Sequence, residues 1–233
     1  MRLLFTISLG LVIVSGSAQS HYFGYKAGFS LTDTWGNDDF GGSKKLQSGF
    51  ALGFTYDYLS GKKFSFGLEL LAERRGVELV DPIVPEPLKH SGTAGMYSVY
   101  GYTMHLYYDY LSLPIKVGYC GDNKFFGSYF IGAIPALLGL SSKKALISYA
   151  DHSKRTFTGS SSPFSSGNSY SIFDVATFID VGCGYRISKK LILQTSLRPQ
   201  YSFTTLWVEG IHSRNYGVTL SVGIKYNFSS KKD

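Results

Sequence analysis

The chain has 233 residues, a formal net charge of +7 and a mean hydropathy near zero. This length suits one all-β domain after a short targeting segment, and no later apolar run approaches the ~20 residues that a membrane-spanning helix requires. A transmembrane β-barrel also has a low mean hydropathy, because only every second residue faces lipid. Aromatic residues at 16% and a total of 27 glycines favour such a barrel.

The first twenty residues have the pattern of a secretory signal peptide. Arg2 gives a positive start, residues 3–14 are almost entirely apolar, and residues 16–18 are small enough for cleavage before Gln19. A buried N-terminal helix is the alternative interpretation. We expect residues 1–18 to be the signal peptide and residues 19–233 to form an outer-membrane β-barrel domain. An exported chain is not expected to meet nucleic acid, so the positive charge points to anionic lipid headgroups.

Seven segments alternate apolar and polar residues with a period of two, which predicts strands with two different faces. The last is the clearest, with Val218 and Leu220 on one face and Thr219 and Ser221 on the other. The segments are 23–31, 49–58, 64–75, 111–119, 174–186, 191–198 and 216–228. An eighth strand is predicted at 125–138. It is apolar on both faces, so its inward side is left unassigned, and Pro135 predicts a bulge within it.

The connections between these strands alternate in length. Short turns are predicted at 59–63, 120–124 and 188–190, and long loops at 32–46, 79–103, 140–169 and 202–213. Short periplasmic turns and long outer loops are typical of membrane barrels. The sequence therefore predicts an all-β fold, an eight-stranded antiparallel up-and-down transmembrane β-barrel in the bacterial outer membrane with both termini in the periplasm.

Aromatic residues and glycines support this orientation of the strand faces. The aromatics cluster at the short-turn end, as an interfacial girdle does: Phe23, Tyr25, Tyr58, Phe64, Tyr119, Tyr185, Tyr226 and Phe228. The alternative is a soluble exported barrel or sandwich, in which the apolar face turns inward. The polar face is rich in glycine, which suits a crowded interior and gains nothing on a solvated surface.

The polar faces carry charges of both signs, which we expect to form a network inside the barrel. The predicted members are Lys26, Glu69, Glu73, Arg75, Lys116, Asp180, Arg186, Arg198 and Lys225. An eight-stranded barrel has an interior just wide enough for side chains to fill. Mutual salt bridges between these residues would close the lumen, so we expect no open aqueous channel.

One pair in this network follows from strand register. Facing residues of an antiparallel pair have a constant index sum, and the turn flanked by Ile187 and Leu191 sets Asp180 opposite Arg198. The alternative is a register shifted by two residues, which leaves Arg198 to another acid such as Glu73. The same strand order predicts that Cys120 and Cys183 do not form a disulfide, because a strand lies between theirs.

Motifs for enzymatic or metal chemistry are scarce. We find no phosphate-binding loop, dinucleotide fingerprint, His-Glu-x-x-His or Gly-x-Ser-x-Gly motif, and we expect no catalytic, cofactor-binding or metal site. The weak alternative is a lipid-modifying acyl hydrolase or transferase at the rim, built from Asp151-His152-Ser153 and His212-Ser213. Adjacent Ser and His point to opposite faces of a strand, which is poor geometry for a nucleophile and its base.

The segment 140–169 is rich in serine and basic residues. Lys143, Lys144, Lys154 and Arg155 outweigh Asp151 there. One interpretation is a solvated mobile loop. The other is a surface that contacts lipopolysaccharide phosphates or a protein partner.

Several motifs resemble those of the PorT-like outer-membrane β-barrel family of the Bacteroidota. The resemblance lies in 110–119 (Tyr-Leu-Ser-Leu-Pro-Ile-Lys-Val-Gly-Tyr), in the opening 24–31 around Gly28, in Glu69-Leu-Leu, and in 180–187 and 220–228. In order and spacing these motifs cover essentially the whole mature chain. Barrels of this kind often end on an aromatic residue, which is part of the signal for β-barrel assembly. Here residues 229–233 follow Phe228, so this signal lies slightly before the end of the chain.

The resemblance implies the barrel fold but does not fix a function, although one branch of the family is implicated in type IX secretion. We expect a non-enzymatic structural or interaction role, with the outer loops as the working surface. The partners are outer-membrane lipids and lipopolysaccharide, and a protein partner whose identity the sequence does not give. An accessory role in a type IX-like secretion system and the rim enzyme are the alternatives.

Overall fold

In the computed structural model, every element of the described part of the chain is a β-strand. The model describes residues 20–38, 43–60, 63–80, 99–149, 153–161, 172–208 and 211–229, so the expected signal peptide lies outside the described residues. The strands are β1 (Ser20–Asp38), β2 (Ser43–Leu59), β3 (Phe64–Val80), β4 (Val99–Ser112), β5 (Ile115–Cys120), β6 (Phe125–Tyr149), β7 (Lys154–Ser161), β8 (Phe173–Arg186), β9 (Leu191–Ser202), β10 (Leu206–Val208) and β11 (Ile211–Asn227). The described ranges contain no helix with the length and apolar character needed to cross a membrane.

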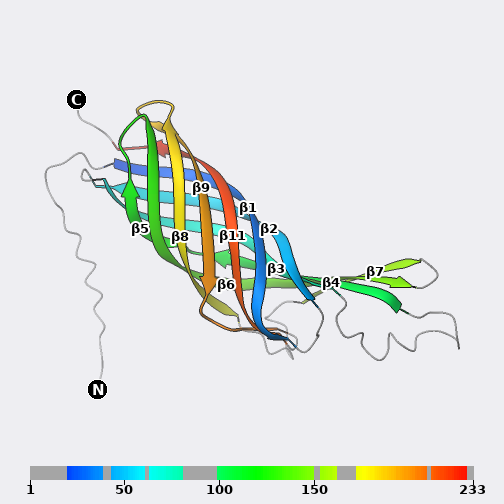
Figure 1. The fold of residues 1–233 in the computed structure, drawn as a ribbon. Helices are drawn as coiled ribbons and strands as arrows, with labels where there is room; N and C mark the ends of the chain where they lie inside the picture. Colours follow the sequence, from blue (N-terminus) through cyan, green and yellow to red (C-terminus); the bar gives the residue numbers. More distant parts are fainter. Residues whose placement is uncertain are drawn as a thin grey trace, which may run out of the picture.

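The strands close into a ring (Figure 1). Neighbours follow the order β1-β2-β3-β4-β6-β8-β9-β11, and β11 returns to pair with β1 along almost its whole length. β5 continues the position of β4, because β3 pairs first with β4 and then with β5. All pairs are antiparallel, so the predicted eight-stranded up-and-down barrel is confirmed.

The two faces of each strand are oriented as predicted, with apolar residues outside and polar residues inside. Phe29 and Leu220 face each other on β1 and β11 and are 54% and 56% exposed. Their neighbours Ser30 and Ser221 are buried. This pattern is the reverse of a soluble barrel, whose apolar face would be buried. The barrel therefore presents a continuous apolar outer wall.

The short turns and the two described chain ends lie at one end of the barrel. The Phe228 N–H donates to the His21 carbonyl at 3.0 Å, which fastens the end of β11 beside the start of β1. The predicted aromatic girdle surrounds this end, and Phe64 and Phe228 in it are more than half exposed.

At the opposite end the strands extend further than the sequence predicted. The region 140–169 was expected to be a loop, but β6 continues to Tyr149 and pairs with β7 in a hairpin. This hairpin and the first half of β4 project beyond the ring (Figure 1). Alternation was not visible here because a hairpin outside an apolar environment has no lipid-facing row of residues.

The bulge predicted at Pro135 lies elsewhere. Pairing of β6 with β8 passes through Pro135 without a shift, whereas its pairing with β4 shifts at Gly139, which has no partner between Leu138 and Leu140. Pro135 is accommodated because it faces the interruption between β4 and β5, where its carbonyl accepts the Leu113 N–H at 2.8 Å.

The inward face of β6 is now assigned, and it is mostly apolar. Phe126, Phe130, Ile134, Ala136 and Leu138 are all buried. Ile134, Ala136 and Leu138 belong to a cluster of buried apolar residues from β3, β4, β6 and β8 that fills the lumen toward the hairpin end. The strand therefore has apolar residues on both faces because one faces outward and the other packs in this internal cluster.

Candidate functional site

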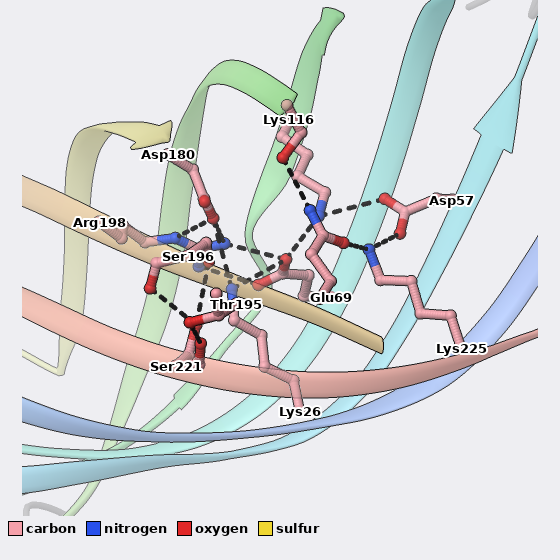
Figure 2. A network of polar contacts seen from close by, with 12 residues as sticks. Lys26, Asp57, Glu69, Lys116, Asp180, Thr195, Ser196, Arg198, Ser221 and Lys225 are labelled. Carbon is pink, nitrogen blue, oxygen red and sulfur yellow. Dashed lines mark hydrogen bonds and ion pairs between the residues drawn. The ribbon is translucent and has the colours of Figure 1, made fainter. Parts of the chain in front are cut away.

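A network of seven charged side chains crosses the middle of the lumen (Figure 2). Seven different strands each supply one residue, and all of these side chains are at most 10% exposed. The members are Lys26, Asp57, Glu69, Lys116, Asp180, Arg198 and Lys225. Buried charges are stable only when they are paired and hydrogen-bonded, and each of these residues has at least one partner of opposite sign.

Glu69 of β3 is the centre of the network. Its Oε1 accepts from Lys116 Nζ at 2.7 Å, and its Oε2 lies 2.8 Å from Arg198 Nη1. Lys26 Nζ lies 3.5 Å from Oε1. One carboxylate therefore holds together cations from three strands on different sides of the lumen.

The predicted pair of Asp180 and Arg198 is confirmed. The register of β8 with β9 sets Gly182 opposite Ser196, which has the predicted index sum. The Arg198 guanidinium donates to Asp180 Oδ2 from Nε at 2.9 Å and from Nη2 at 2.5 Å. The same guanidinium stacks on Phe178, with its Cζ 4.3 Å from the centroid of the phenyl ring.

Asp57 of β2 completes the network and was not among the predicted members. Its two oxygens lie 3.1 Å from Lys116 Nζ and 2.5 Å from Lys225 Nζ. Gly67 makes this possible, because a Cβ there would lie 2.4 Å from both Asp57 Oδ1 and the Lys116 side chain. Asp57 was already on the polar face of its strand, so strand parity was the signal that could have identified it.

A second cluster lies in the lumen around Arg75. Its Nη2 donates to Glu73 and its Nη1 to Asp174, both at 2.6 Å. Ser112 donates to Glu73 at 2.9 Å, and Asp174 also accepts from Ser202 at 2.8 Å. Glu73 is thus the partner of Arg75, so the alternative pairing of Glu73 with Arg198 does not occur. Asp174 is the second charged lumen residue that was not among the predicted members.

The structure corrects the expectation for Arg186, which makes no ion pair with the described residues. Arg186 ends β8 beside the short turn that precedes β6, where backbone carbonyls are within reach. Its guanidinium donates to the carbonyls of Gly121 and Asn123 at 2.9 and 3.2 Å and to the Tyr22 hydroxyl at 3.1 Å. It also stacks on Phe126, so it closes the short-turn end rather than joining the network.

The two clusters balance in charge. Five cations (Lys26, Arg75, Lys116, Arg198 and Lys225) are paired with five anions (Asp57, Glu69, Glu73, Asp174 and Asp180). The described lumen cavities beside the central network measure only about 20 and 10 Å³. Each is about the space of a single water molecule. Side chains rather than solvent therefore fill this part of the barrel.

The residues of the rim-enzyme hypothesis fall largely outside the described part of the chain. Asp151 and His152 are not described, and neither is the side chain of His212. Ser213 is buried. His105 contacts Gln47 Oε1 at 2.8 Å and Glu78 at 3.6 Å. Within the described ranges no three His, Cys, Asp or Glu residues are grouped to hold a metal ion.

The basic residues of the hairpin divide into two sets. Lys143 and Lys144 line an open groove of about 380 Å³ on the outside of the barrel, next to Arg74. Lys154 and Arg155 lie on β7 and do not line it; Arg155 instead stacks on Tyr149, at 5.9 Å from the ring centroid.

No protein-family model matches the chain, and no curated protein matches it in sequence. Among solved structures it is similar to Neisserial surface protein A, at 14% identity and a TM-score of 0.43 over 91% of this chain and 100% of that one. It is also similar to the outer membrane protein OprG from Pseudomonas aeruginosa, at 11% identity and a TM-score of 0.46 over 92% and 99%. Ail of Yersinia pestis is 14% identical, with a TM-score of 0.37 over 89% and 98%. The assignment of this chain to the eight-stranded barrel fold rests on its own closed ring of strands.

Proposed function

We propose that this chain is an outer-membrane β-barrel protein with a closed lumen and a non-enzymatic structural or interaction role, performed at its hairpin end. The observation that carries the proposal is the balanced ion-pair network. It occupies the interior that a transport protein would leave open. The apolar outer wall supports insertion in a membrane, because hydrocarbon is the surroundings in which such a wall is stable.

The proposed orientation places both termini and the aromatic short-turn end in the periplasm and the hairpin outside the cell. Cleavage of residues 1–18 as a signal peptide belongs to the same proposal. Short turns on the periplasmic side and longer extensions outside are the common arrangement of such barrels. Protease added to intact cells should therefore cut the β6–β7 hairpin and leave an epitope tag after Asp233 intact.

The closed lumen is tested by recordings from pure protein in planar lipid bilayers. We expect no steady conductance, because the charged side chains are paired with each other and the described cavities beside them have about the size of one water molecule. Steady conductance of nanosiemens size would contradict the proposal.

The role of the hairpin is tested by removing residues 144–158. The pairing of β6 with β8 extends only to Leu137, so this segment lies outside the closed ring of paired strands. The shortened chain should still fold in the outer membrane but should reproduce the envelope defect of a strain that lacks the chain. A shortened chain that fully complements that strain would contradict a working surface on the hairpin.

A second candidate is an accessory role in type IX-like secretion, favoured by the order of the PorT-like motifs along the chain. It predicts that a deletion strain fails to export type IX cargo to its surface. The lipid A mass spectrum of the same strain tests the rim enzyme, for which we expect no change.

A further inference from the structure

Strand β7 leaves one edge of the β6–β7 hairpin open. Among the described strands it pairs only with β6, from Lys154 opposite Ser148 to Ser161 opposite Ser141. The hairpin projects beyond the ring (Figure 1), and residues 154–158 and Ser160 are all exposed. The main-chain N–H and C=O groups along such an edge are available to pair with another strand.

The hydrogen bond that closes the hairpin identifies the main-chain groups on this open edge. The Tyr149 N–H donates to the Ser153 carbonyl at 3.0 Å, so these two residues form a hydrogen-bonded pair. Such pairs alternate along an antiparallel ladder, and the regular register of β6 with β7 extends the alternation to every odd-numbered residue of β7. The residues whose N–H and C=O groups point to the open edge are therefore Lys154, Thr156, Thr158 and Ser160.

The open edge of β7 is complementary to a second copy of itself. An antiparallel pair centred on Phe157 sets Thr156 opposite Thr158 of the other copy, and Lys154 opposite Ser160. Every residue with outward main-chain groups then meets another such residue and can exchange two hydrogen bonds with it. Phe157, which is 46% exposed, faces its own counterpart as a non-hydrogen-bonded pair, in which side chains lie closest. Facing aromatic and threonine pairs stabilise a sheet.

The charges of β7 favour this register. Lys154 and Arg155, at the tip of the hairpin, are its only charged residues. The pair centred on Phe157 sets both of them opposite uncharged residues, whereas a pair centred on Arg155 would oppose like charges, which is destabilising. Lysine and proline commonly protect strand edges from pairing. Residues 156–161 contain neither, so the edge is unprotected away from the tip.

We propose that β7 pairs along its open edge with β7 of a second copy of this chain, about a two-fold axis at Phe157. The inference deepens the proposed role of the hairpin as a working surface and rests on it. The tip of each hairpin lies beside the base of the other, which keeps the two rings apart at opposite ends of the joined hairpins. One short strand buries little surface, so the contact belongs to the small, transient class of interfaces.

Disulfide trapping tests the pair and its register in the full chain purified in detergent micelles. The variants are Phe157→Cys, Thr156→Cys and Thr158→Cys, each in a C120S/C183S background that removes the two free thiols. Facing residues of a non-hydrogen-bonded pair have Cα atoms ~4.5 Å apart, within the range that a disulfide spans. Oxidised Phe157→Cys should therefore migrate at twice the monomer mass in non-reducing electrophoresis.

Thr156→Cys and Thr158→Cys are the matched controls, because both positions are as exposed as Phe157. Across the two-fold axis each of them is diagonal to its own counterpart at ~7–8 Å, which is too far for a disulfide. Neither should form the covalent dimer. Equal linking of all three variants would overturn the register, and the absence of a Phe157→Cys dimer would overturn the pair.

Sedimentation of variants that keep Phe157 provides a second measurement. The unaltered chain should shift from monomer to dimer as its concentration rises. Thr156→Pro removes an outward N–H, a change that an edge strand tolerates, and should abolish this shift. Thr156→Ala keeps the N–H and should dimerise like the unaltered chain. Equal dimerisation of the two variants would overturn pairing through the edge.

Folding is followed separately, by the difference in electrophoretic migration between unheated and boiled protein. A folded chain that stays monomeric at every concentration would overturn the self-pairing and leave the hairpin as a working surface for another partner. Full complementation by the chain without residues 144–158 would contradict the proposed function instead. That result is measured in cells and does not depend on the trapping experiment.

Discussion

Glu69 is the residue whose neutralisation should reveal whether the lumen network stabilises the barrel. Its side chain is fully buried, and three cations lie within 3.5 Å of it. Glu69→Gln keeps the size of the side chain but changes the central network from four cations and three anions to four and two. Removal of one partner from a buried ion pair typically costs ~3–5 kcal/mol, because the other charge is left without compensation. We expect a loss of that size in the free energy of unfolding.

The assay is urea-induced unfolding in detergent micelles, followed by tryptophan fluorescence and by the migration of unheated protein in electrophoresis. Asp109→Asn is the matched control. It breaks the pair with Arg74 on the outer wall, where the two side chains are 28% and 36% exposed. Ion pairs at such partly exposed positions contribute up to ~1 kcal/mol.

A compensating substitution makes the prediction stricter. Lys26→Met added to Glu69→Gln removes one of the stranded cations, so the double variant should be more stable than the sum of the two single effects implies. Coupling between neighbouring buried charges is typically about 0.5–3 kcal/mol. A Glu69→Gln variant no less stable than Asp109→Asn, or strictly additive effects of the two lumen substitutions, would refute the reasoning.

Two further predictions concern packing and thiols. Gly53→Ala should destabilise the barrel by ~1–3 kcal/mol in the same unfolding assay, because its Cβ would lie 1.9 Å from the backbone oxygen of Leu70. Gly127→Ala on the outer wall, with no heavy atom nearer than 3.7 Å, is the control and should leave stability unchanged. Cys120 and Cys183 are both free thiols and should react with a maleimide in unfolded protein without prior reduction. A band shift on reduction in electrophoresis would instead reveal a disulfide and contradict the strand order.

Strand positions and local register were predictable because they depend on neighbours in sequence. Alternation identified seven of the eight ring positions, and one tight turn was enough to place Asp180 opposite Arg198. Contacts across the lumen were not predictable in the same way. Asp57 meets Lys116 and Lys225 from β5 and β11, and this depends on the stagger of the whole ring, to which every strand contributes.

The strand predicted at 125–138, which is β6 of the structure, shows a different limit of sequence patterns. Alternation distinguishes the faces only when one is apolar and the other polar. Ile134 packs in an apolar cluster inside the barrel and Phe130 is buried there beside Lys116, while Tyr129 and Ile131 face outward. The four residues are alike in hydropathy although their surroundings differ. When part of a barrel interior is apolar, the sequence pattern of the strand there does not show which face points inward.

The charge balance of the lumen connects the fold to the proposed place of the chain in the outer membrane. Five cations and five anions cancel inside the barrel, so the formal charge of +7 belongs to the rest of the chain. The interior could not hold that surplus, because unpaired buried charge would destabilise it by several kcal/mol. On the surface the same charge is stable because water solvates it, and anionic partners stabilise it further.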